Sequence, residues 1–150
     1  MPHGDTRDTR DSQGGESRAE LESIAREWIS LWCAPVDWGL FDRLHADGFE
    51  DCSAAGRDPT KEAFADGLAD LVAAFPNLQT TLEDLVIDET TSRVAVRWSS
   101  VGTNRSAFLG IGPTGRQVAI TGIEIIEIAG RRIVRRWGEW DIGGHVHAVR

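Results

Sequence analysis

The spacing of apolar residues changes near Asn77, and this change constrains the fold more than any other feature of the sequence. Before Asn77, apolar residues recur every three or four positions, as on one face of a helix. After it they alternate with polar residues, as in strands buried on one side. The sequence therefore predicts helices followed by an antiparallel sheet, which is an α+β domain.

Three helices are predicted from their start and stop signals. Ser17, Asp37 and Thr60 are residue types that cap helices, and each precedes an apolar stripe. Ser17 and Glu20 together have the form of a capping box. A turn and a short extended piece are expected over 48–53. The predicted helices cover 18–33, 38–45 and 61–75, and Pro76 ends the last of them.

Four strands rich in Val, Ile, Thr and Trp are predicted after Asn77. They cover 78–87, 93–103, 116–128 and 132–142. The separators at 88–92 and 129–131 are short enough for antiparallel neighbours, whereas 104–115 is a long loop. We expect a cone-shaped, curved antiparallel sheet with the three N-terminal helices on its concave side, enclosing a pocket.

Length, charge and cysteine content exclude several classes of protein. A chain of 150 residues fits a single domain, expected over 17–150 after a disordered tail at 1–16. The net charge of −8 argues against nucleic acid or an anionic membrane as partner. Two cysteines make no disulfide framework, no apolar run can span a bilayer, and the charged N-terminus is not a secretory signal. A cytoplasmic location is therefore expected.

The last predicted strand carries charge where a core strand is normally apolar. A period of two places Trp137, Glu139 and Asp141 on one face and Arg136, Gly138 and Trp140 on the other. If the first face looks inward, two carboxylates share an apolar interior. Burial and like-charge repulsion would then raise a carboxyl pKa into the range useful for acid–base chemistry. The alternative is a carboxylate in a salt bridge at the rim of the sheet.

Several segments together resemble the SnoaL-like polyketide cyclase family, which lies within the nuclear-transport-factor-2-like superfamily. Their order and spacing match over about 20–141, and the set is specific although each piece alone is weak. The segments are Phe75-Pro76-Asn77-Leu78, Arg93-Val94-Ala95-Val96-Arg97-Trp98, Phe108-Leu109-Gly110-Ile111-Gly112-Pro113-Thr114-Gly115-Arg116, Gly122-Ile123-Glu124-Ile125-Ile126 and Trp137-Gly138-Glu139-Trp140-Asp141.

The resemblance implies a chemistry without metal or organic cofactor. Such cyclases close a ring by intramolecular aldol condensation of an aromatic polyketide ester, and an acidic residue in the pocket transfers the protons. Asp141 is the position that matches this residue, and Glu139 on the same strand face would assist it. The resemblance also implies a homodimer, with the outer face of the sheet as its interface.

Glu124 lies in the middle of an otherwise apolar strand and has two interpretations. A short hairpin at 129–131 would bring it close to Arg135 or Arg136. It is either a third catalytic acid in the pocket or the cross-strand ion partner of one of these arginines, and the ion pair is favoured.

Aromatic residues are predicted to line the pocket and to bind a hydrophobic or aromatic metabolite, although such spacing is also typical of core packing. Relatives have a Phe-x-Asp-His stretch where this chain has Phe49-Glu50-Asp51-Cys52, so Cys52 replaces a histidine near the pocket. The candidate substrate-binding residues are Trp28, Trp32, His45, Cys52, Phe64, Trp98, Phe108 and Trp137.

No metal site and no cofactor are expected. His145 and His147 are two positions apart in a glycine-flanked tail and have no third ligand at a suitable spacing. The sequence also contains no G-x-S-x-G elbow, P-loop or dinucleotide fingerprint.

Two other functions remain open on the same fold. Related epoxide hydrolases hold an arginine between two carboxylates that activate water, and Arg97 or Arg135 with Asp141 and Glu124 would imitate that arrangement. A non-catalytic ligand-binding or dimer-forming module is the third hypothesis, because fold alone does not decide function.

Overall fold

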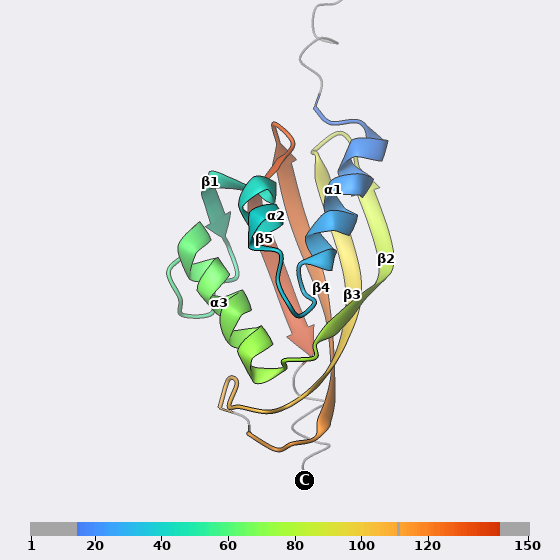
Figure 1. Ribbon diagram of the computed structural model, residues 1–150. Coiled ribbons are helices and arrows are strands. Elements are labelled where there is room, and N and C mark those ends of the chain that lie inside the picture. Colours follow the sequence, from blue (N-terminus) through green and yellow to red (C-terminus); the bar gives the residue numbers. More distant parts are fainter. Residues whose placement is uncertain (1–14, 111, 142–150) are drawn as a thin grey trace, which may run out of the picture.

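The structure is a computed structural model that describes residues 15–110 and 112–141 (Figure 1). Its three described helices precede four of its five described strands, as the sequence pattern indicates. The described helices are α1 (Arg18–Ser30), α2 (Trp38–Leu44) and α3 (Lys61–Ala74). Ser17 Oγ, Asp37 Oδ1 and Thr60 Oγ1 each accept a hydrogen bond from the backbone N–H three residues on, at 3.2, 3.0 and 3.2 Å. All three predicted caps are thus confirmed, although α1 ends three residues earlier than expected.

The sheet of the described chain has the strand order β1-β5-β4-β3-β2. Its four C-terminal strands are antiparallel neighbours, which confirms the predicted strands and turns. β1 pairs with β5 in parallel, whereas the sequence predicted only a short extended piece there. The strands are β1 (His45–Asp51), β2 (Gln79–Asp88), β3 (Arg93–Thr103), β4 (Gln117–Ala129) and β5 (Arg132–Asp141).

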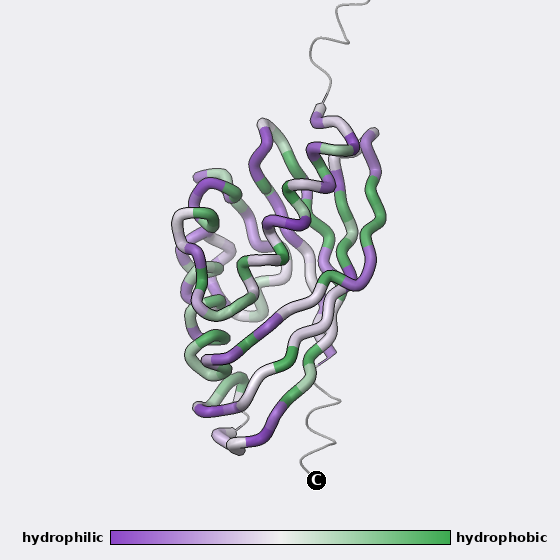
Figure 2. The backbone as a smooth tube through the Cα atoms, turned by 45° about the vertical axis from the view of Figure 1, so that its right-hand side comes forward, coloured by the Kyte–Doolittle hydropathy of each residue, from purple (hydrophilic) through white to green (hydrophobic). Residues whose placement is uncertain are grey.

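The three helices cover one side of the curved, unclosed sheet and leave the other side bare (Figure 1). We call the covered side the inner face and the bare side the outer face. Hydropathy changes from residue to residue along the strands (Figure 2), and in β3 and β4 the alternate residues are buried. The core fills the space between helices and inner face, and includes Leu21, Trp28, Val94, Trp98 and Ile126.

The N-terminal boundary of the folded domain includes Glu16, which the sequence assigned to the tail. The Glu16 carboxylate accepts a hydrogen bond from the Arg131 backbone N–H at 2.7 Å, in the turn between β4 and β5. The rest of the predicted tail, residues 1–14, lies outside the described residues. None of the described helices has the length and apolar character needed to cross a membrane.

Candidate functional site

A bulge near the start of β5 decides which face each acidic residue occupies. Ile133 is fully buried on the inner face, but the pairing of β4 with β5 shifts by one residue at Val134. One extra residue moves every following side chain to the opposite face. The inner face beyond the bulge therefore holds Arg136, Gly138 and Trp140.

The expectation that Glu139 and Asp141 face the interior is therefore wrong. Both are exposed, and they pair with the outer-facing residues Ile123 and Thr121 of β4. They do share one strand face, as the period of two predicted. Glu124 is inner-facing and 2% exposed, so the three predicted catalytic acids lie on opposite sides of the sheet.

A buried ion-pair chain occupies the inner face, and we call Asp51, Arg136 and Glu124 the charge cluster. Arg136 Nε donates to Glu124 Oε2 at 2.9 Å and Nη2 donates to Oε1 at 3.1 Å, a bidentate pair. Arg136 Nη1 donates to Asp51 Oδ1 at 2.9 Å. The three side chains are at most 5% exposed, so the cluster is shielded from water. The predicted ion pair of Glu124 with an arginine is thus confirmed.

Burial and charge act against each other within the charge cluster. Burial raises the pKa of Glu124, while Arg136 and the Trp140 indole, which donates to Oε1 at 2.7 Å, oppose that rise. Burial alone would lower the pKa of Arg136, but Glu124 and Asp51 outweigh it and raise the pKa. The Arg136 guanidinium also lies 5.3 Å from the centre of the Phe64 ring. The cluster combines a carboxyl group that burial makes more basic with a permanent positive charge.

Gly138 makes room for this pair. A Cβ at Gly138 would overlap Glu124 Oε2 and lie 2.6 Å from its carboxyl carbon, and it would also overlap Arg136 Nη2. Gly138 is directly opposite Glu124 in the β4–β5 pairing, so the Glu124 carboxylate and the Arg136 guanidinium meet over the Gly138 backbone. The glycine of the Trp-Gly-Glu-Trp segment is therefore part of the site.

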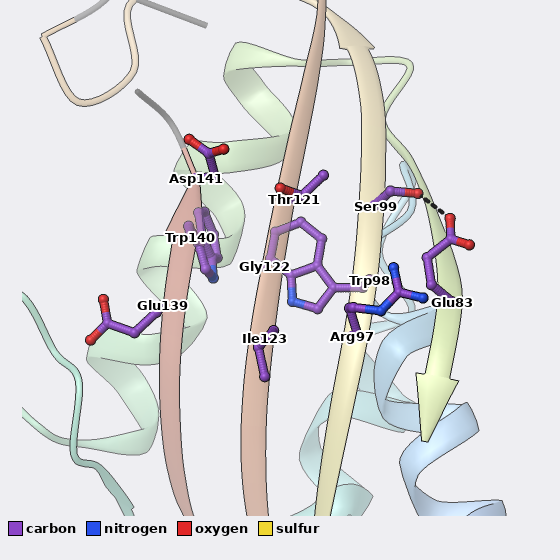
Figure 3. A pocket seen from close by; sticks show the side chains of 10 residues that line it. All are labelled: Glu83, Arg97, Trp98, Ser99, Thr121, Gly122, Ile123, Glu139, Trp140 and Asp141. Carbon is purple, nitrogen blue, oxygen red and sulfur yellow. Dashed lines mark hydrogen bonds between the residues drawn. The ribbon is translucent and has the colours of Figure 1, made fainter. Parts of the chain in front are cut away.

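An open hollow of about 760 Å³ lies on the outer face, and Glu139 and Asp141 project from β5 at its side (Figure 3). Across the hollow, the Ser99 hydroxyl donates to Glu83 at 2.6 Å. The two predicted acids thus border a surface hollow rather than the interior. Its lining comprises Glu83, Arg97, Trp98, Ser99, Thr121, Gly122, Ile123, Glu139, Trp140 and Asp141.

His45 is held in the core as a neutral ring. Its Nδ1 lies 2.7 Å from the Phe41 carbonyl, and its Nε2 accepts from the Trp28 indole at 3.0 Å. These contacts require a proton on Nδ1 and a lone pair on Nε2. Burial lowers the pKa of His45 to about 4. Both ring nitrogens are occupied, so His45 has a structural role.

The other predicted substrate-binding residues lie in different parts of the structure. Trp28, Trp32 and Phe64 are buried core residues between the helices and the sheet. Trp98 contacts Trp140 edge-on at 5.3 Å, beside the charge cluster, and Phe108 packs against Phe75. Trp137 lies on the outer face beneath the Arg93 guanidinium, 5.0 Å away, and Cys52 is exposed.

Sequence reasoning missed Asp51 and Arg136 as site residues. A signal existed for Asp51, because it holds the Asp position of the Phe-x-Asp-His stretch. The bulge concealed Arg136, since it was counted on the face opposite to the acids. No group of three His, Cys, Asp or Glu residues suited to a metal occurs among the described residues, and His145 and His147 lie outside them.

Solved structures share this architecture. TsrD from Streptomyces laurentii superimposes with a TM-score of 0.78 and 19% identity, covering 88% of this chain and 96% of TsrD. AclR from Streptomyces galilaeus gives 0.76 and 21%, covering 89% and 86%. IdmH from Streptomyces antibioticus gives 0.73 and 22%, covering 86% and 97%. At these identities the likeness establishes the fold.

The sequence itself establishes the family. No curated protein matches it significantly. The model of one protein family, however, matches residues 22–146, which is most of the chain and includes all three residues of the charge cluster. The chain belongs to the SnoaL-like polyketide cyclase family.

Proposed function

We propose that this protein is a cofactor-independent acid–base enzyme that acts on a hydrophobic, aromatic or polyketide-type small molecule. Family membership supports a small-molecule role of the cyclase or isomerase type. IdmH, one of the neighbours in fold, is described as a proposed polyketide cyclase. The observation that carries the proposal is the position of Glu124, a buried carboxyl group on the inner face beside Arg136 and Trp140.

In the proposed reaction, Glu124 removes a proton from a carbon next to a carbonyl group. Burial raises the pKa of Glu124, which makes its carboxylate a stronger base than an exposed glutamate. Loss of the proton gives an enolate, whose negative charge the adjacent Arg136 stabilises. The enolate then attacks a second carbonyl to close a ring, and protonated Glu124 gives its proton to the alkoxide that forms. In an isomerisation Glu124 returns the proton to another carbon of the enolate instead. Trp140, which is partly exposed and contacts the buried Trp98 edge-on, offers an aromatic surface for a planar ligand.

Asp51 and the loop behind it hold Arg136 in place for this role. Asp51 Oδ1 accepts from Arg136 Nη1 and from the Ser53 backbone N–H at 3.1 Å. Arg136 Nη1 also donates to the Ser53 carbonyl at 3.3 Å. The guanidinium therefore stays fixed when Glu124 changes its protonation state, which is the preorganisation that enolate stabilisation needs.

Addition of water is a second candidate reaction, and the charge cluster itself favours it. An arginine between two carboxylates is the arrangement that water-activating epoxide hydrolases of this architecture use. Here the chain is Asp51–Arg136–Glu124, not one built from Arg97, Arg135 or Asp141. Glu124 would take a proton from the water molecule that attacks the epoxide and then give this proton to the opened oxygen, which yields a diol and restores the carboxylate.

The test is a substrate screen with wild type and three variants. The panel contains aromatic 1,3-diketone esters, for ring closure or isomerisation, and alkyl and aryl epoxides, for hydration. We expect Glu124→Gln to lower kcat at least about 100-fold, the usual contribution of a general base. Asp141→Asn and Glu139→Gln are the matched outer-face controls and should retain wild-type rates. Thermal melting of each variant checks that it is folded.

The outcomes separate the candidates. Reaction in H₂¹⁸O labels the product of epoxide hydration, because one of its oxygen atoms comes from water. Ring closure and isomerisation add no oxygen from water to their products. If Glu124→Gln keeps full turnover and Asp141→Asn abolishes it, the catalytic acid lies in the outer hollow and the inner-face proposal is wrong. If no variant changes the rate at which a substrate is turned over, none of the three acids takes part.

We also propose that the outer face binds a second copy of the chain. The helices leave this face bare (Figure 1), and its exposed apolar residues include Val86, Val101, Ile123 and Ile125, which are 39 to 66% exposed. Val86, Ala95 and Ile125 lie opposite one another on three neighbouring strands, and Ile123 follows Ile125 on the same face of β4. An exposed apolar patch of this kind marks an interaction site. Glu139 and Asp141 would then lie at or near a dimer interface.

A further inference from the structure

Arg57 closes the solvent side of the charge cluster. Its Nη2 donates to Asp51 Oδ2 at 3.3 Å, and the Arg57 side chain is 41% exposed while that of Asp51 is 1% exposed. The other carboxylate oxygen of Asp51, Oδ1, accepts hydrogen bonds from Arg136 and Ser53. Arg57 therefore sits between water and the inner carboxylate.

The backbone brings Arg57 to this position by a tight turn. Ala55 and Gly56 have φ values of 51° and 89°, and the Arg57 N–H donates to the Ala54 carbonyl at 3.1 Å. The Arg57 Nε donates to the same carbonyl at 3.2 Å. The turn folds the connection between β1 and α3 back on itself, so that the guanidinium reaches over Asp51.

Gly67 provides the place where the guanidinium rests on α3. A Cβ at Gly67 would overlap Arg57 Nη1 and lie 2.8 Å from Cζ. Glycine within a helix is unfavourable relative to alanine, so its presence in α3 calls for a reason. The docked arginine supplies one, because any side chain at Gly67 would push the guanidinium off the helix.

We propose that Arg57 is a positioning residue and a gate: docked on Gly67 it covers Asp51 Oδ2, and swung into solvent it opens a path to the charge cluster between β1 and α3. The Arg57 side chain makes two hydrogen bonds, of 3.2 Å to the Ala54 carbonyl and 3.3 Å to Asp51, and is 41% exposed. When it swings out, water solvates the guanidinium and reaches Asp51 Oδ2, which limits the cost of breaking the ion pair. Opening gives Asp51 and Arg136 access to water or ligand. The gate deepens the proposed function, since it concerns access to the same site.

Hydrogen exchange tests the gate without any substrate. The probe is the Arg136 Nε–H, which is buried against Glu124 and visible by NMR. Gly67→Ala should undock Arg57 while leaving the helix intact, and Arg57→Ala should remove the gate. In both variants the Arg136 Nε–H should exchange with water about three- to fivefold faster than in wild type, the factor that loss of such an ion pair gives.

Two controls keep the result specific. Gly39→Ala removes a glycine from α2, where a Cβ would meet Arg43 Nη1 at 3.4 Å, and should leave the exchange unchanged. The Trp28 Nε1–H, bonded to His45 deep in the core, should exchange at the wild-type rate in every variant. Wild-type exchange at Arg136 in both Gly67→Ala and Arg57→Ala would overturn the gate. Faster exchange at Trp28 as well would assign the effect to general unfolding and equally overturn it.

The exchange result is independent of the proposed function. If Glu124→Gln retains turnover but the exchange rises as expected, the gate stands and the catalytic assignment fails. If turnover is lost in Glu124→Gln but exchange does not change, the catalytic assignment stands and ligands reach the cluster by another path.

Discussion

His45 shows how one buried residue makes the stability of the fold depend on pH. The ring has no access to water, donates to Phe41 and accepts from Trp28. A second proton on Nε2 would break the bond from Trp28 and place a positive charge beside the buried Lys61 ammonium, which donates to the His45 carbonyl at 3.0 Å. Desolvation therefore lowers the pKa of His45 to about 4 from the ordinary 6.5.

We expect His45 to weaken the fold as the pH falls. Below about pH 6.5 His45 is protonated in the unfolded chain, whereas in the folded chain it stays neutral down to about pH 4. The free energy of unfolding should fall by roughly 2 to 3 kcal/mol between about pH 7 and pH 4.5 from this residue alone. In His45→Gln, whose amide can replace both hydrogen bonds, this part of the loss should vanish. Urea unfolding at the two pH values measures it, and equal pH dependence in both proteins would contradict the assignment.

At the scale of the element, β5 shows where the sequence is informative and where it is not. The strand, its bounds and its antiparallel partner followed from alternation and a short turn. The face did not, because the bulged residue Val134 follows Ile133 and both are apolar, so the bulge leaves no mark on the pattern. One residue of register thus exchanged Glu139 and Asp141 for Arg136 and Trp140 on the inner face.

Gly138→Ala tests the fit between β5 and the charge cluster. The added Cβ would overlap Glu124 Oε2 and Arg136 Nη2, so it should split the bidentate pair or bend the strand. We expect the free energy of unfolding to fall by about 2 to 4 kcal/mol, as for overpacking together with a broken buried ion pair. The matched control is Gly48→Ala in β1, where a Cβ meets nothing within 4 Å. Equal denaturation midpoints for the two variants would show that Gly138 is not required.

At the scale of the whole molecule, the sequence predicted the helices, the antiparallel strands and their order. It missed the parallel pairing of β1 with β5, because β1 carries few apolar residues and meets β5 only through contacts distant in sequence. That pairing brings Asp51 to Arg136, so the charge cluster was missed with it. Glu124 alone was found, since an acid in an apolar strand stands out in the pattern.

The bare outer face gives a prediction about assembly. If a second copy covers it, wild type should elute and scatter light as a dimer, because burying the exposed Ile123, Val101 and Val86 side chains favours association. Ile123→Glu would place a charge in the apolar part of such an interface and should shift the mass toward that of one chain. Leu109→Glu is the matched control, because Leu109 is as exposed as Val86, at 66%, but lies in the loop after β3. Since Ile123 is 54% exposed on the face opposite the charge cluster, the Ile123→Glu monomer should keep its fold. A monomeric wild type, or an unchanged mass in Ile123→Glu, would show that this face does not bind a second copy.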